Sequence, residues 1–284
     1  LRHPWRWVSA VVVGLVLAWI IYSLVTAPTI RHDVIAKYLF DGQILDGAWL
    51  TVILTFLSMF IATILAVLLA IMRISENVVL RASASLFVNF FRGTPLLLQI
   101  VFWGYLGIIW PNLMLGIPFT DIVFFSAPTN DVISAFTAGV IALSLNEAAY
   151  ASEIVRAGIT SVDSGQSEAA KSLGMTTGRM FRRIVLPQAM RVIIPPMGNE
   201  TISMMKSTSL LAVVAVMELY TRASQISSQN LAQIELLVVA GFWYLVLNAI
   251  LSVPQSYLEK KYGRGFNTTT ATRRWFSGVP KAAS

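Results

Sequence analysis

Long apolar stretches alternate with polar connections along this chain of 284 residues. Each apolar stretch reaches about 18 residues or more, which is the length at which an α-helix crosses a bilayer. The pattern predicts an all-α membrane protein with six transmembrane helices. The predicted spans are Trp7–Ala27, Gly47–Ile71, Ser85–Trp110, Ile133–Ile154, Val192–Val216 and Leu236–Val253. The first is roughly 31 Å long as a helix, so we interpret it as a retained span rather than a cleaved signal peptide.

The connections divide the chain into an N-terminal part, a core and a tail. Residues 1–46 hold the first helix and an outer linker, and residues 47–261 hold the other five helices. Residues 262–284 have little periodicity and are expected to form a disordered tail. The longest connection, 155–191, is basic. The connection 111–132 is apolar for a loop, and the pattern leaves open whether it dips into the membrane interface or packs on the outer mouth of the bundle.

Composition supports the membrane interpretation. The chain is 56% hydrophobic and 12% charged, whereas about 25% of residues are charged in soluble domains. It has no cysteine, which excludes a disulfide framework, a thiolate metal site and a cysteine nucleophile. A formal charge of +7 would raise nucleic acid as a partner for a soluble chain, but here the basic residues follow the predicted topology.

Most basic residues, 16 of the 21 in the chain, fall on one side of the predicted bundle. If both termini are cytoplasmic, the outer side holds only Arg31, Lys37 and Arg222, and two more basic residues, Arg92 and Lys206, lie within apolar segments. This bias follows the positive-inside rule. We therefore predict a multi-pass protein of a prokaryotic cytoplasmic membrane with both ends in the cytoplasm.

The segment Glu168–Pro187, EAAKSLGMTTGRMFRRIVLP, lies in the long basic connection. Ser167 is placed to cap a first helix, and Gly174 is placed to end that helix in a turn. A second short helix is predicted over Thr177–Leu186 and is expected to stop at Pro187.

One face of the first helix is expected to hold Ala169, Ala170 and Leu173, which are small and apolar enough to enter a groove on another protein. Arg179 and Arg182 are then available to pair with acidic groups of that protein or with lipid phosphates. An amphipathic helix lying in the membrane interface is the alternative interpretation.

The spacing of Glu168, Ala169, Ala170, Gly174 and Pro187 resembles the coupling loop of ABC-importer permeases, the element by which the membrane subunit holds its ATPase. Further stretches resemble the permeases of polar amino-acid importers, the group that takes up histidine, glutamine, glutamate and arginine. These stretches are DSGQSEAA around Gln166, FRGTPLLLQ from Phe91, AYASEIVRAGI from Ala149 and NETISMMKSTSL from Asn199. The resemblance covers residues 47–261 and implies a type I importer fold with five core helices and an added first helix.

The resemblance implies a transport subunit and not an enzyme. The chain has no G-x-x-x-x-G-K-[S/T] motif, so ATP and Mg²⁺ are expected to act through a separate ATPase, with no cofactor on this chain. The expected partners are an ATPase dimer, a second permease subunit that is identical or homologous, an extracytoplasmic binding protein and a polar amino acid. The residues implied to contact the ATPase are Gln166, Glu168, Ala169, Ala170, Leu173, Gly174, Arg179 and Arg182.

A charged residue, Arg92, lies within the third predicted span. A central arginine costs about 2.5–3.5 kcal/mol on insertion scales, so we expect Arg92 to face protein, a cavity or the headgroups. Thr94 and Pro95 follow it and are expected to bend the helix. We predict a structural or gating role for these three residues, while contact between Arg92 and a substrate carboxylate stays open.

The fifth predicted span carries polar residues on one face. Asn199, Ser203 and Lys206 follow helical spacing, and Glu200 lies beside them. With Glu147 of the fourth span, they are predicted to border a substrate pathway in which the acids receive an ammonium group and Lys206 receives a carboxylate. Contacts between two permease subunits are the alternative role. Many relatives carry an acid where this chain has Ser207, which weakens any inference that the substrate is cationic.

An ion-coupled secondary transporter is the alternative function. It would work alone and would need buried acidic relays, for which Glu147 and Glu200 are candidates, but it leaves the basic loop unexplained. A membrane enzyme finds little support, because His3 and His32 lie far from any acidic cluster and the sequence shows no metal or nucleophile constellation.

Overall fold

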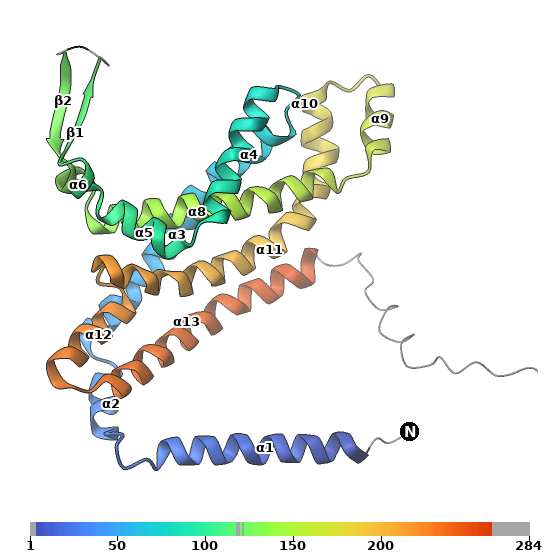
Figure 1. Ribbon diagram of the computed structural model, residues 1–284. Coiled ribbons are helices and arrows are strands. Elements are labelled where there is room, and N and C mark those ends of the chain that lie inside the picture. Colours follow the sequence, from blue (N-terminus) through green and yellow to red (C-terminus); the bar gives the residue numbers. More distant parts are fainter. Residues whose placement is uncertain (1–3, 118–119, 121, 263–284) are drawn as a thin grey trace, which may run out of the picture. The chain divides into compact units, whose positions relative to one another are not determined.

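The computed structural model describes residues 4–117, 120 and 122–262, and most of these residues are helical (Figure 1). The predicted tail, 262–284, lies outside the described residues except for Tyr262. The chain forms two compact units, one made of the described residues up to Thr51 with Met217–Leu245, and the other made of Val52–Val216 with the described residues from Val246 onward.

The first unit contains helices from both ends of the sequence. Its elements are α1 (Pro4–Val25), α2 (His32–Tyr38), the start of α3 (Gly42–Ile74), α12 (Leu219–Asn230) and the first half of α13 (Gln233–Tyr262).

A buried carboxylate joins three helices of this unit. Glu218 accepts hydrogen bonds from the backbone N–H of Thr221 at 2.8 Å and from the Tyr244 hydroxyl at 2.7 Å. Thr51 of α3 lies against the same carboxylate. Because a buried acid is costly unless it is hydrogen-bonded, these donors hold the start of α12 against α3 and α13.

The second unit contains the predicted loop and pathway. Its elements are the rest of α3, α4 (Val78–Gly93), α5 (Leu96–Gly104), α6 (Leu106–Ile109), β1 (Asn112–Gly116), β2 (Val123–Pro128), α7 (Thr129–Val132), α8 (Ala135–Thr160), α9 (Ser164–Ser172), α10 (Thr177–Met180), η1 (Phe181–Val185), α11 (Leu186–Ser207), η2 (Thr208–Val214) and the end of α13. The apolar connection 111–132 thus contains a hairpin, in which β1 and β2 pair antiparallel with Leu113 opposite Ala127.

The central element of the second unit is α8, which packs against α4, α5 and α11 (Figure 1). Its buried positions are mostly alanine, glycine and serine, which allow neighbouring helices to approach closely. A Cβ atom at Gly158 would collide with Ile193 of α11. The sequence of α8 therefore determines how near its neighbours lie.

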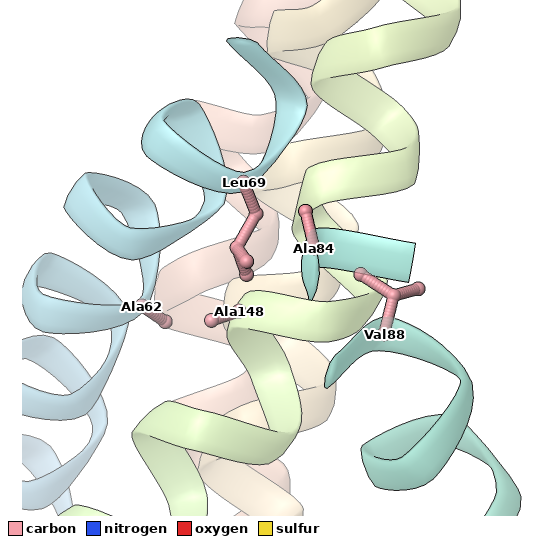
Figure 2. Packing of buried hydrophobic residues seen from close by; sticks show 5 residues of the cluster. All are labelled: Ala62, Leu69, Ala84, Val88 and Ala148. Carbon is pink, nitrogen blue, oxygen red and sulfur yellow. The ribbon is translucent and has the colours of Figure 1, made fainter. Parts of the chain in front are cut away.

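One apolar cluster shows this packing (Figure 2). It combines Ala62 and Leu69 of α3, Ala84 and Val88 of α4, and Ala148 of α8. The alanines at 62 and 148 are fully buried. With so little volume at these positions, the leucine of α3 fills the space that the three helices share.

The predicted number of six spans is not confirmed. Among the described residues, α3 and α13 are long and apolar enough to cross a membrane, and up to four spans result if each of two bent helix pairs counts as one. The third predicted span, Ser85–Trp110, is not a continuous helix, since α4 and α5 meet at an angle of 100°. In α1, the apolar helical stretch Trp7–Ile20 is shorter than the predicted first span.

We expect Ala148→Leu to destabilise the protein by roughly 1–3 kcal/mol, because the added methyl groups have no space between α3, α4 and α8. Thermal unfolding of the detergent-purified chain, followed by loss of the monodisperse chromatography peak, measures this effect. Ala157→Leu is the matched control, since Ala157 is exposed on the same helix. Equal melting temperatures for the two variants would contradict the close packing.

Candidate functional site

The first helix of the basic loop, α9, begins earlier than predicted. Its N-cap is Asp163, whose Oδ1 accepts a hydrogen bond from the backbone N–H of Gly165 at 2.7 Å. The predicted cap, Ser167, lies inside the helix. An aspartate at the N-cap also places a negative charge at the positive end of the helix dipole, which favours this start over the later serine.

Gly174 ends α9 in the way the sequence predicts. Its φ of +74° places it in the left-handed region, which glycine adopts without strain. The N–H of Gly174 donates to the Lys171 carbonyl at 2.9 Å, and the N–H of Met175 donates to the Ala170 carbonyl at 3.1 Å. This pair of bonds is a Schellman motif, and it turns the chain sharply toward α10.

The three apolar residues of α9 do not share one exposed face, contrary to the prediction. Ala170 is buried, while Ala169 is exposed and Leu173 is 82% exposed. The reason is that α9 packs on α10 and η1, so its inner side is already covered. The surface left for a partner combines Leu173 and Ala169 with the exposed polar residues Gln166 and Glu168.

The second predicted helix begins at Thr177 as expected but does not stop at Pro187. The helical path continues through the π-helical turn η1 into α11, and Pro187 lies in the first turn of α11. The wider turn changes the hydrogen-bond register before the proline, and the side chain of Gln188 donates to the Ile184 carbonyl at 2.9 Å. An open hollow of about 610 Å³ on this segment is lined by Gly178, Arg179, Arg182 and Arg183.

The bend between α4 and α5 is held by two buried amide side chains. Gln99 donates to the carbonyls of Phe91 and Thr94 at 2.9 and 3.1 Å and to the Thr94 hydroxyl at 2.8 Å. Asn146 of α8 donates to the Phe91 carbonyl at 3.1 Å and to Gln99 Oε1 at 3.2 Å. Pro95 removes a backbone N–H, so these amides satisfy carbonyls that the broken helix leaves free.

Gln99 was not singled out from the sequence, although a glutamine within an apolar run is the signal that could have found it. The predicted bend at Thr94 and Pro95 is confirmed, because these two residues lie between the end of α4 and the start of α5.

Arg92 has an acidic partner. Its Nη1 lies 3.3 Å from Oε1 of Glu153, which also pairs with Arg73 of α3 and, at 2.9 Å, with Arg156 of α8. The Arg92 guanidinium lies 5.2 Å from the centre of the Tyr150 ring. Sequence reasoning missed Glu153, because nothing in the local pattern indicates that three helices bring arginines to it.

A cavity of about 220 Å³ lies between α5, α8 and α11. It brings together three of the predicted pathway residues, Glu147, Glu200 and Ser203. The other lining residues are Leu96, Leu143, Asn146, Tyr150, Met204 and Ser207.

Two predicted pathway residues do not line this cavity. The side-chain Nδ2 of Asn199 donates a hydrogen bond to Oε1 of Glu259 of α13 at 3.4 Å. Lys206 is exposed and forms no ion pair with a described residue. The lining face of α11 holds Glu200, Ser203 and Ser207, so it keeps the predicted Glu200 and Ser203 but turns away from Asn199 and Lys206 toward Ser207.

The cavity lining is acidic and holds no basic side chain. Glu147 is buried, and its Oε1 has no hydrogen-bond partner among the described residues. A buried carboxylate oxygen without a donor is costly, and it is suited to receive a cation or a hydrogen-bond donor. The hydroxyls of Tyr150 and Ser203 supply uncharged donors in the same space, while the Ser207 hydroxyl donates to the Ser203 carbonyl.

Comparison with known proteins assigns the family. Residues 62–264 match the family described as binding-protein-dependent transport system inner membrane component. The chain is 45% identical over 283 residues to the arginine transport system permease protein of Corynebacterium glutamicum, covering 99% of this chain and 87% of that protein. It is 39% identical over 220 residues to the L-cystine transport system permease protein of Bacillus subtilis, covering 77% and 86%. A crystal structure of an amino acid ABC transporter with histidines aligns with a TM-score of 0.68 and 33% identity, covering 82% of this chain and 99% of that chain.

We expect Gln99→Met to lower the stability of the second unit by about 1–3 kcal/mol, because the Thr94 carbonyl loses its buried donor. Thermal unfolding in detergent measures the loss, and the exposed Gln225→Met serves as the control. If Gln99→Met melts at the temperature of the unaltered protein, the amide does not hold the bend.

Proposed function

The chain belongs to the family of binding-protein-dependent transport system inner membrane components, and from this premise we propose that it is the permease subunit of an ATP-driven importer of polar amino acids. An extracytoplasmic binding protein delivers the amino acid. The observation that carries this proposal is the exposed surface of α9 in the basic loop, which lies within the matched region and which a stand-alone carrier leaves unexplained.

The lining of the cavity favours a cationic amino acid. Two carboxylates, Glu147 and Glu200, face it without a basic residue, and a desolvated carboxylate is best paired with a cation. An α-ammonium or guanidinium group supplies that cation. The similarity to an arginine permease agrees with this choice, so arginine is the first substrate to test.

The carboxylate of the substrate then needs donors other than those the sequence suggested. Arg92 pairs with Glu153, and Lys206 lies outside the cavity lining. The hydroxyls of Tyr150 and Ser203 are available instead, whereas the Ser207 hydroxyl donates to the Ser203 carbonyl at 3.1 Å.

The exposed surface of α9 is the proposed contact with the ATPase. Leu173 and Ala169 would enter a groove of the ATPase, while Glu168, Arg179 and Arg182 would form charged contacts around it. ATP and Mg²⁺ act on the ATPase dimer, whose closure moves α9 and, with it, the cavity helices α8 and α11. A second permease subunit completes the pathway, and both termini of this chain lie in the cytoplasm.

We expect Leu173→Asp to abolish co-purification of the ATPase, because a charge would be buried in the groove that receives the leucine. Leu231→Asp is a matched control, since Leu231 is 83% exposed but lies outside the basic loop. The ATPase retained on the affinity-tagged permease is measured for both variants. A chain that still transports arginine without any ATPase would instead be a stand-alone carrier.

We expect Glu147→Gln and Glu200→Gln to reduce arginine uptake by the reconstituted complete importer roughly 10-fold or more, since each removes a charge-assisted contact. Uptake of labelled arginine into proteoliposomes is the measurement, and Glu76→Gln, at an exposed acid, is the control. The yield of assembled complex is recorded in parallel. Loss of assembly with unchanged uptake per complex would place these acids in the subunit interface and refute their role in the pathway.

A further inference from the structure

A cluster of three arginines surrounds one carboxylate at the C-terminal part of α8. We call it the arginine cluster, and it consists of Arg73, Arg92 and Arg156 around Glu153. The Nη1 atoms of Arg73 and Arg92 both point to Oε1, while Nε of Arg156 bonds to Oε2 at 2.9 Å. Residues from α3, α4 and α8 therefore meet at one acidic group.

The charges of this cluster do not balance. Three guanidinium groups face one carboxylate, and no other described acid lies within ion-pair distance of them. Each arginine directs a single nitrogen to Glu153, which leaves most of the donors of its guanidinium without an acceptor among the described residues. Two positive charges thus remain uncompensated at the boundary of the apolar bundle, where an anion would be stabilised.

The cluster is open on one side. The side chains of Arg92 and Arg156 are 44% and 38% exposed, whereas that of Arg73 is 17% exposed. Tyr150 lies beneath Arg92 and orients its planar guanidinium. An anion with several oxygens can therefore reach two arginines whose positions are already set by Glu153.

Exposed apolar side chains lie next to the cluster in the sequence of both neighbouring helices. They are Ile74 of α3 and Leu86 of α4, each about a third of a turn around its helix from the arginine of that helix. A free anion cannot bury these apolar side chains. An amphiphile can, because its headgroup binds the arginines while its acyl chains cover the apolar residues. On the proposed topology, this end of α8 is cytoplasmic, where anionic lipids face the protein.

We propose that the arginine cluster binds the phosphate group of an anionic membrane phospholipid. Arginine is suited to this role because its fork of donors bonds two phosphate oxygens at once. Glu153 does not contact the lipid and acts as a positioning residue that gathers the three arginines. The bound lipid offsets one of the two uncompensated positive charges where α3, α4 and α8 meet. The site adjoins the acidic cavity at Tyr150 and shares no other residue with it.

The complete importer, in detergent with an equimolar mixture of phosphatidylglycerol and phosphatidylcholine, provides the test. Native mass spectrometry counts the molecules of each lipid that stay bound. We expect selective retention of phosphatidylglycerol, reduced roughly 10-fold in Arg92→Gln and in Arg156→Gln and partly restored in Arg92→Lys. Arg81→Gln is the matched control, because Arg81 is an exposed arginine on α4 that forms no ion pair within the described part of the chain.

Two outcomes would overturn the proposal. One is equal retention of the two lipids, or selective retention that survives both Arg92→Gln and Arg156→Gln. The other is displacement of the bound lipid by millimolar inorganic phosphate, which would assign the cluster to a soluble phosphate. Melting temperatures of all variants are recorded, and retention is compared at temperatures where each variant is folded, so that unfolding does not imitate loss of the site.

Discussion

The interior of the second unit depends on the hydrogen bonds that Gln99 and Asn146 make to the bend between α4 and α5. No water is expected in an apolar bundle to bond the carbonyls of Phe91 and Thr94, which the break in the helix leaves without backbone donors. Without the amides of Gln99 and Asn146, these buried carbonyls would make the broken helix too costly to form. With these bonds in place, the chain turns by 100°, Leu96 at the start of α5 lines the cavity, and Arg92 at the end of α4 reaches Glu153. Both polar sites of the unit follow from this one bend.

One helix, α8, carries both of these sites. Glu147 lines the acidic cavity, and Glu153, about 9 Å further along the helix, gathers the arginine cluster. Tyr150 belongs to both, because it lines the cavity and lies beneath Arg92. The small residues of α8 hold α11 close enough for Glu200 to face the same cavity. Acidic and basic groups are thereby kept apart along one rigid element.

The same helix leads directly into the proposed ATPase contact. Asp163 starts α9 three residues after α8 ends at Thr160, and the Schellman turn at Gly174 returns the chain toward α10 and α11. Since α11 follows without a stop at Pro187, α8 and α11, two of the three helices around the cavity, are continuous with the loop. Under the proposed function, a push on the exposed side of α9 would act on these two helices.

The class of molecule, the turn at Gly174 and the bend at Thr94–Pro95 could be predicted from the sequence. These follow from apolar lengths and the backbone chemistry of single residues, which are local properties. The family was indicated by the resemblance of sequence motifs, and the comparisons with known proteins confirm it. The structure alone decided that Ala170 is covered, that Asn199 and Lys206 do not line the cavity with Glu200, and that Glu153 joins three arginines. Each of these depends on how helices distant in sequence are rotated against one another, and a shift of one residue turns a side chain by about 100°. Periodicity identifies a helical face but does not identify the neighbour that it meets.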